Sequence, residues 1–245
     1  MATNKPDNGP PINAQDFERS MITLNLKRSR KLSNPYIFIM MISLSFIGIP
    51  QSSYAQSATD DPLSKNPSYR EGYALIEAKD YKNSKIKFDN LIKSNKVSSG
   101  AYFGRGRSYH ELGNYQAALT DYKSAISENP SNAKAHSNLG LVYGSLKNFK
   151  SSIQSLDRAI EIDPKLDHAY VNRGVARGAS GDINGAISDF SKSIEINPNY
   201  ATAWANRGIT LEMTGNKSGA CRDWRKAAQL GRKDAQAWVK AQCNQ

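Results

Sequence analysis

The sequence predicts an all-α protein, a right-handed solenoid of five helix-turn-helix units followed by one capping helix. Three observations predict it: a ladder of glycines at one spacing, further columns of matching residues in the same register, and turn residues between them. A 34-residue period is typical of arrays of paired helices, which stack into solenoids. The glycines with this period are Gly72, Gly106, Gly140, Gly174 and Gly208.

Each unit is predicted to hold two helices, because stretches such as 101–112 and 116–126 place apolar or small residues at helical spacing. We expect the ladder glycine to face the small-residue column at Ala118 and its equivalents, and the bulky column at Tyr122 to fill the space between hairpins. Asn114 and its equivalents mark the mid-unit turn and cap the second helix. Pro130, Pro164 and Pro198 close three units, since proline cannot continue a helix. The units are predicted at 65–98, 99–132, 133–166, 167–200 and 201–234, with the capping helix at 235–245.

These columns resemble those of the tetratricopeptide repeat family over about residues 65–245. In one unit the resemblance is carried by Tyr170, Gly174, Gly181, Ala186, Phe190 and Pro198. Six positions depart from the residue that is common in the family: an aromatic residue is expected at Ser68, proline at Lys96 and Arg232, leucine at Arg173 and Arg207, and tyrosine at Arg177. Terminal units of such arrays are expected to be atypical, because one side faces solvent.

The resemblance implies that the first helix of each unit lines a concave groove that holds a partner. The most suggestive residues are the asparagines two places before three ladder glycines, because an amide both donates to and accepts from a peptide backbone. Basic and aromatic neighbours would favour an acidic or carboxylate-ended segment; packing of the first helices is the alternative role of the asparagines. The groove candidates are Asn138, Asn172, Asn206, Arg70, Arg107, Lys134, His168, Tyr69 and Tyr73.

The amino-terminal part has the order of a secretory signal: basic residues 27–31, the apolar run 36–49, and small residues Ser53 and Ala55. The apolar run is shorter than the roughly 20 residues of a membrane span, which favours cleavage after Ala55 over a single-pass signal anchor, the alternative. Met21 offers a start at a normal distance from the charges. Either way the repeats are expected outside the cytoplasm, in a periplasm, a lumen or the medium, with 56–64 as a flexible lead-in.

The charge balance bears on the class of partner. Residues 56–245 carry 27 Lys and Arg against 19 Asp and Glu, so the repeats themselves are basic. Export and the lack of a dense basic run argue against nucleic acid. A solvated basic surface and an anionic partner both fit this balance.

Cys221 and Cys243 are the only cysteines, and an even count in an exported chain favours a disulfide over two free thiols. Two helices folding about Gly231 would bring them level and pin the capping helix to the last unit. His110, His136 and His168 occupy different columns, so neither a metal site nor a catalytic triad is predicted, and no nucleotide-binding motif is present. No cofactor and no enzymatic activity are expected.

The sequence therefore predicts a non-catalytic scaffold that binds a peptide or protein segment outside the cytoplasm, for assembly or maintenance of an envelope or membrane complex. Two alternatives stay open: a binder of an anionic glycan or other polyanion, and a self-associating structural protein. A membrane would be reached only through an uncleaved signal anchor.

Overall fold

The computed structural model describes residues 61–243, and these residues form helices and no strand. The expected signal segment, the alternative start at Met21 and residues 56–60 lie outside them. None of the helices in 61–243 is long and apolar enough to cross a membrane. The helices are α4 (Pro67–Glu77), α5 (Tyr81–Lys93), α6 (Ser99–Glu111), α7 (Tyr115–Glu128), α8 (Ala133–Ser145), α9 (Phe149–Ile162), α10 (Asp167–Ala179), α11 (Ile183–Ile196), α12 (Ala201–Met213), α13 (Lys217–Gln229) and α14 (Lys233–Gln242).

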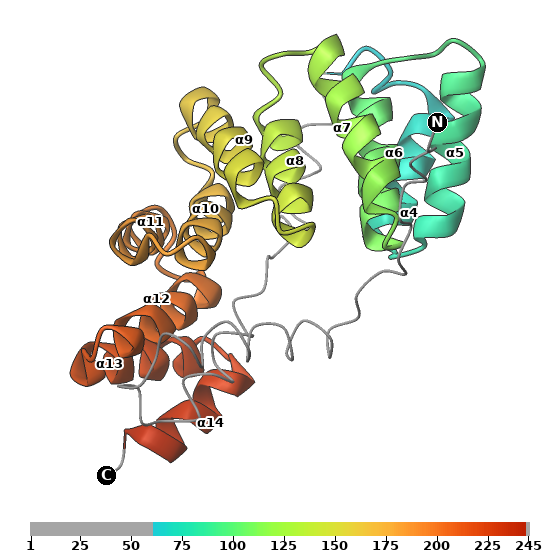
Figure 1. Ribbon diagram of the computed structural model, residues 1–245. Helices are drawn as coiled ribbons and strands as arrows, with labels where there is room; N and C mark the ends of the chain where they lie inside the picture. The colour runs from blue at the N-terminus through green and yellow to red at the C-terminus, as the bar shows by residue number, and fades with distance from the viewer. Residues whose placement is uncertain (1–60, 244–245) are drawn as a thin grey trace, which may run out of the picture. The chain divides into compact units, whose positions relative to one another are not determined.

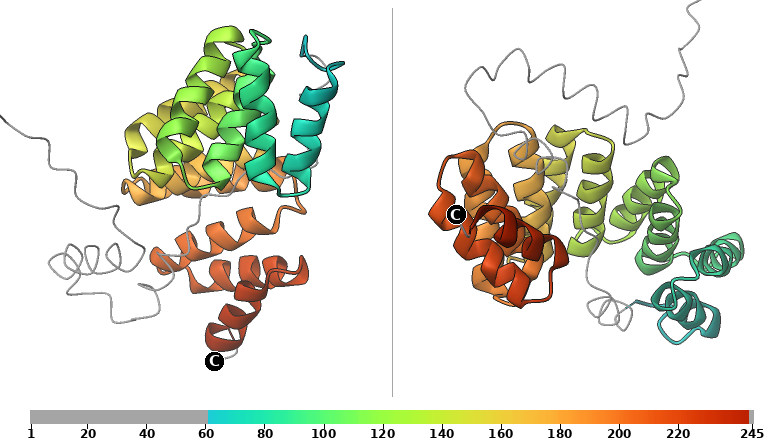
Figure 2. Two further views of the ribbon diagram at one scale, coloured as in Figure 1. Left: turned by 90° about the vertical axis from the view of Figure 1, so that its right-hand side faces the viewer. Right: turned by 90° about the horizontal axis from the view of Figure 1, so that it is seen from below.

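The helices pair in sequence order into five hairpins, from α4 with α5 to α12 with α13, and α14 follows alone (Figure 1). Each second helix also contacts the first helix of the next hairpin, so the hairpins stack in chain order; Figure 2 shows the same order from two further sides. The first helices α4, α6, α8, α10 and α12 touch one another in turn. They line one common side of the stack, called here the first-helix face.

The mid-unit turns form as predicted. Asn114 caps α7 by accepting a hydrogen bond from the Ala117 amide at 3.1 Å, and the equivalent Asp or Asn caps every other second helix. The residue before each cap has positive φ, which glycine adopts most readily. Gly113, Gly181 and Gly215 occupy this place in three turns, but Lys79 and Lys147 adopt φ of 60° in the other two.

The ladder glycines contact the small column as expected, since a Cβ at Gly140 would lie 3.0 Å from the Ser152 carbonyl oxygen, but they also contact the bulky column. A Cβ at Gly174 would lie 2.7 Å from Phe190 Cε1, and one at Gly208 would lie 2.6 Å from Trp224. The bulky residues therefore pack over the glycine of their own hairpin, which corrects the expectation that they only fill the space between hairpins. Phe88 does both, because it also packs against Gly104 of the next hairpin. The small residue still contributes, as Ser152 Oγ donates to the Gly140 carbonyl at 2.7 Å.

Both ends of the array are tied to it. Asp61 to Lys65 form a turn in which Asp61 Oδ2 accepts from the Gly100 amide at 2.8 Å and Leu63 packs on the core. At the other end α14 begins at Lys233, and Ala235 and Trp238 pack on Ala205 and Ala227.

Candidate functional site

The asparagine row consists of Asn138 on α8, Asn172 on α10 and Asn206 on α12. Because these helices touch in turn and the residues share one register, the three side chains repeat along the first-helix face. All three are buried, with 2%, 1% and 1% of their surface exposed. Neither the amide nitrogen nor the amide oxygen of Asn206 has a hydrogen-bond partner in the described residues. A buried polar group without a partner costs about 1–3 kcal/mol.

Most of the other groove candidates are buried as well. Tyr69 and Tyr73 lie in the hydrophobic core, where both rings pack against Phe88, which corrects the expectation that they stand open in the groove. Tyr73 donates its hydroxyl to the Gly100 carbonyl at 2.8 Å. Desolvation by burial raises the pKa of both phenols, so neither contributes charge.

The charged groove candidates differ in exposure. Arg107 and His168 are 4% and 2% exposed; Arg107 Nη1 lies 3.9 Å from Glu77, and His168 Nδ1 lies 3.4 Å from Asp167. Lys134 is partly exposed, and desolvation lowers its pKa. Arg70, in the register of the asparagine row, is exposed. The structure thus leaves Arg70 and Lys134 as the accessible basic groups among the candidates.

A second polar column was noted in the sequence only in part, because Arg173 and Arg207 were named as departures from the family and Arg105 was not. Arg105, Arg173 and Arg207 each bind an aspartate of their own second helix through Nε and Nη2, at 2.6–3.0 Å. The partners are Asp121, Asp189 and Asp223. These pairs are called here the arginine seam. Such two-point pairing fixes the guanidinium more firmly than a single contact.

The third nitrogen of each seam arginine reaches the preceding hairpin. Arg105 Nη1 contacts Asp89 at 3.0 Å and Arg173 Nη1 contacts Asp157 at 2.7 Å, whereas Arg207 Nη1 meets the hydroxyl of Ser191 at 3.1 Å. The Asp121 hydrogen bond raises the pKa of Arg105. Burial acts to raise the pKa of Asp89, but hydrogen bonds from Lys85 and Arg105 outweigh it and lower that pKa. The seam therefore joins neighbouring hairpins with ionised groups.

The seam could have been found in the sequence. Positions 16 residues apart hold opposite charges in four units, including the reversed pair Glu71 with Lys87, which lie 2.8 Å apart. The third unit replaces both charges together, with Leu139 and Ser155. Arg177 belongs to the same network, since its Nη1 lies 2.8 Å from Asp189.

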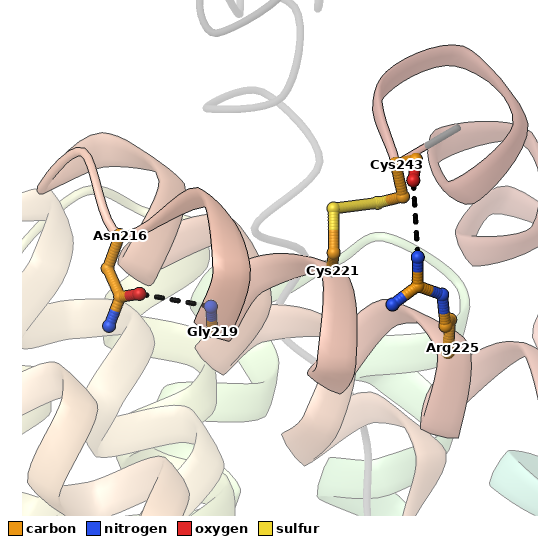
Figure 3. The surroundings of a disulfide bond; sticks show 5 residues. All are labelled: Asn216, Gly219, Cys221, Arg225 and Cys243. Carbon is orange, nitrogen blue, oxygen red and sulfur yellow. Dashed lines mark hydrogen bonds between the residues drawn. A yellow bond between two sulfur atoms is a disulfide. The ribbon is translucent and has the colours of Figure 1, made fainter. Parts of the chain in front are cut away.

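The predicted disulfide joins Cys221 of α13 to Cys243 at the end of α14 (Figure 3). Arg225 of α13 donates to the Cys243 carbonyl at 3.2 Å beside it, and the rings of Trp224 and Trp238 lie 5.8 Å apart. Arg232, which replaces the expected proline, binds Asp234 and donates to Thr202 at 3.0 Å. The bond closes a loop whose cross-linking is typically worth about 3 kcal/mol.

The described residues contain no group of three or more His, Cys, Asp or Glu that could hold a metal ion. His136 packs in the aromatic column and its Nε2 lies 3.1 Å from the Pro130 carbonyl, as Trp204 Nε1 lies 2.8 Å from the Pro198 carbonyl. Desolvation lowers the pKa of His136 and of His110. These contacts fit the packing role predicted for His136.

Stacked hairpins with one shared face of first helices define a helical repeat protein of the interaction-scaffold class. Five segments match tetratricopeptide repeat descriptions, together spanning residues 69–222. The chain belongs to the tetratricopeptide repeat family. The matched segments are 69–126, 106–147, 133–166, 167–200 and 190–222.

Solved structures agree on the fold. A thermophilic TPR protein from Thermus thermophilus has a TM-score of 0.61 at 16% identity, covering 72% of this chain and 97% of its own. A crystal structure of MamA scores 0.58 at 22% identity and covers 67% and 96%. MamA from Desulfovibrio magneticus RS-1 scores 0.59 at 18% identity and covers 67% and 93%. No curated protein matches the chain. Tetratricopeptide repeats are generally non-catalytic scaffolds for protein–protein interaction.

Proposed function

We propose that the chain works outside the cytoplasm, where its first-helix face holds an extended segment of a protein partner during assembly or maintenance of an envelope complex. The observation that carries this proposal is the asparagine row, above all Asn206. Its amide has two hydrogen-bonding atoms without a partner among the described residues. A peptide backbone offers the donor and the acceptor that such an amide needs. Because Asn206 is only 1% exposed, neighbouring side chains must move aside before a peptide can reach its amide.

The charge near the row supports an acidic or carboxylate-ended partner. Arg70 stands in the register of the row on α4 and is exposed, and Lys134 lies in the first turn of α8, four residues before Asn138. Both can contact a carboxylate without leaving the solvent. Salt should therefore weaken binding, because exposed charges are screened.

Photo-cross-linking in the native cell tests the face. A photoreactive residue at Arg70 or Lys134 should yield one protein adduct, whereas the same residue at Ile86, an exposed position of α5, should not. Equal adducts from all three positions would refute a partner on the first-helix face. Adducts only between copies of the chain would instead support self-association.

Asn206→Leu separates binding from folding. The exchange removes an unpaired buried amide, so the melting temperature should hold or rise, while the adduct yield at Lys134 should fall at least fivefold. Asn114→Ala is the matched control, because Asn114 caps α7 by accepting from Ala117 at 3.1 Å and lies away from the row. This variant should lower the free energy of unfolding by about 1 kcal/mol and leave the adduct yield unchanged. The reverse pattern would show that the row serves packing alone.

The disulfide supports the proposed location, since disulfides form and persist in oxidising compartments. Thiol trapping in intact cells measures it directly. Cys221 and Cys243 should resist alkylation until a reductant is added. Immediate alkylation of both in freshly opened cells would contradict export of the repeats.

A further inference from the structure

A hollow of about 410 Å³ lies between α11, α12 and α13 and belongs to no function assigned above. Trp204, Arg207 and Leu211 share one side of α12, because they stand three and seven residues apart. Asn206 points away from that side, so the hollow is separate from the asparagine row. Its wall is completed by Ile187, Ser191, Asn216, Arg222 and Asp223.

The other two seam arginines show which group normally lies next to the third guanidinium nitrogen. In the second and fourth units an aspartate of the preceding second helix, Asp89 or Asp157, binds the third nitrogen of the seam arginine. Ser191 stands at the equivalent place before Arg207 and supplies only a neutral hydroxyl. Among the seam arginines of the described residues, Arg207 is thus the one that has no second carboxylate as a partner.

Two further replacements distinguish the hollow from its equivalent one unit earlier: Leu211 makes it wider and Arg222 adds a positive charge. The residues that line the hollow carry a net charge of +1, while their equivalents 34 residues earlier carry −1. Leu211 stands where Arg177 binds Asp189 in the fourth unit, so the side chain that fills the equivalent space is shorter. Arg222 stands where the fourth unit has Ser188, and it forms no ion pair within the described residues.

We propose that this hollow is a receptor for a carboxylate, taken from an acidic side chain of a protein partner. The carboxylate would lie between the free edge of Arg207 and the guanidinium of Arg222, against the hydroxyl of Ser191. An aspartate or glutamate side chain is the occupant because aspartates of this fold already fill the same seat at Arg105 and Arg173. The Trp204 ring, with the Arg207 guanidinium carbon 5.0 Å from its centroid, holds the arginine in place from one side.

The site takes part in binding independently of the first-helix face. A partner could be held at either surface alone, so loss of one leaves the other measurable. Charge-assisted contacts of this kind are about twice as strong as neutral hydrogen bonds. Replacing the carboxylate by an amide should therefore weaken binding roughly tenfold, which corresponds to about 1.4 kcal/mol.

The test is a nuclear magnetic resonance titration of the chain with acetyl-Gly-Glu-Gly-amide, read at the Trp204 indole N–H and the Arg207 Nε–H. Both signals should shift and saturate, and the Gln analogue should need roughly tenfold more peptide. Absence of a shift, or equal shifts by the two peptides, would overturn the proposal.

Two variants make the test specific. Ser191→Asp places an aspartate beside Arg207, as Asp89 and Asp157 lie beside Arg105 and Arg173. It should therefore abolish the shift at Arg207 without lowering the melting temperature. Ser188→Asp adds the same charge at an exposed place one turn away on α11 and should keep a saturable shift. Arg222→Ser should weaken binding roughly tenfold by itself. Unchanged binding in Ser191→Asp or in Arg222→Ser would place the peptide elsewhere and refute the site.

Discussion

The asparagine row and the arginine seam occupy neighbouring positions of α10 and α12, yet Asn206 and Arg173 differ in how their polar groups are satisfied. Arg173 and Asp189 meet through two hydrogen bonds, and Arg173 reaches a further carboxylate on the preceding hairpin. Asn206 is as buried as Asp189, but its amide has no such partner in the described residues. A repeated residue whose partner repeats with it serves the fold. A buried amide without a partner in the described residues, such as that of Asn206, is a better candidate for binding.

The largest expected effect is the loss of a seam carboxylate. Asp189→Ala leaves Arg173 and Arg177 without their shared partner, and Asp189 is only 2% exposed. Breaking a buried pair from one side costs about 3–5 kcal/mol. Urea unfolding measures it, with Asn206→Leu in the same chain background as the contrasting variant. Similar losses in both variants would erase the distinction between seam and row.

The next largest effect is expected at the glycine ladder. Gly174→Leu forces a side chain into space where even a Cβ would lie 2.7 Å from the Phe190 ring. Overpacking of this kind costs about 1–3 kcal/mol and sometimes more. Gly178→Ala on the same helix is the control, because a Cβ there would find its nearest neighbour, the Ala186 Cβ, at an ordinary 3.6 Å. A melting temperature for Gly174→Leu as high as that of Gly178→Ala would contradict the close contact.

The third unit offers a constructive test, since it lacks the seam. Leu139→Arg alone should destabilise the chain, because Leu139 is only 8% exposed. The position of the seam aspartate is occupied by Ser155 in this unit, so the new arginine would have no carboxylate there. Adding Ser155→Asp supplies one there, and the double-mutant cycle should give a coupling of about 1 kcal/mol or more. Zero coupling by urea unfolding would mean that the seam geometry does not transfer between units.

The fold could be predicted from the sequence, because a regular 34-residue period is typical of stacked pairs of helices. It also placed the turn caps and the Cys221–Cys243 bond, since both follow from local position. The contact of the glycines with the small column was predicted, but the packing of the bulky column over them was missed, because a period does not say which further columns lie over the glycine. Burial of Tyr69 and Tyr73 was missed for the same reason: helical spacing alone does not separate a groove from a core. The seam was within reach, because opposite charges change together at positions 16 residues apart.

The smallest expected effect is a loss of stability at low pH. It should depend on the carboxylates of the seam and not on the asparagine row. The folded-state pKa of Asp89 is lowered, so at pH 5 the carboxylate is ionised in both states and its pairing with Arg105 is fully present. As pH falls below about 4, the unfolded chain takes up the proton first, and stability is lost until the folded group also protonates. Solvent reduces this loss because Asp89 is partly exposed. Urea unfolding at pH 5 and pH 3 should show a shallower fall in Asp89→Asn than in the parent chain. Asn206→Leu should keep the parent slope, because an amide does not titrate, and a flattened slope in that variant would mean that the row and the seam are coupled.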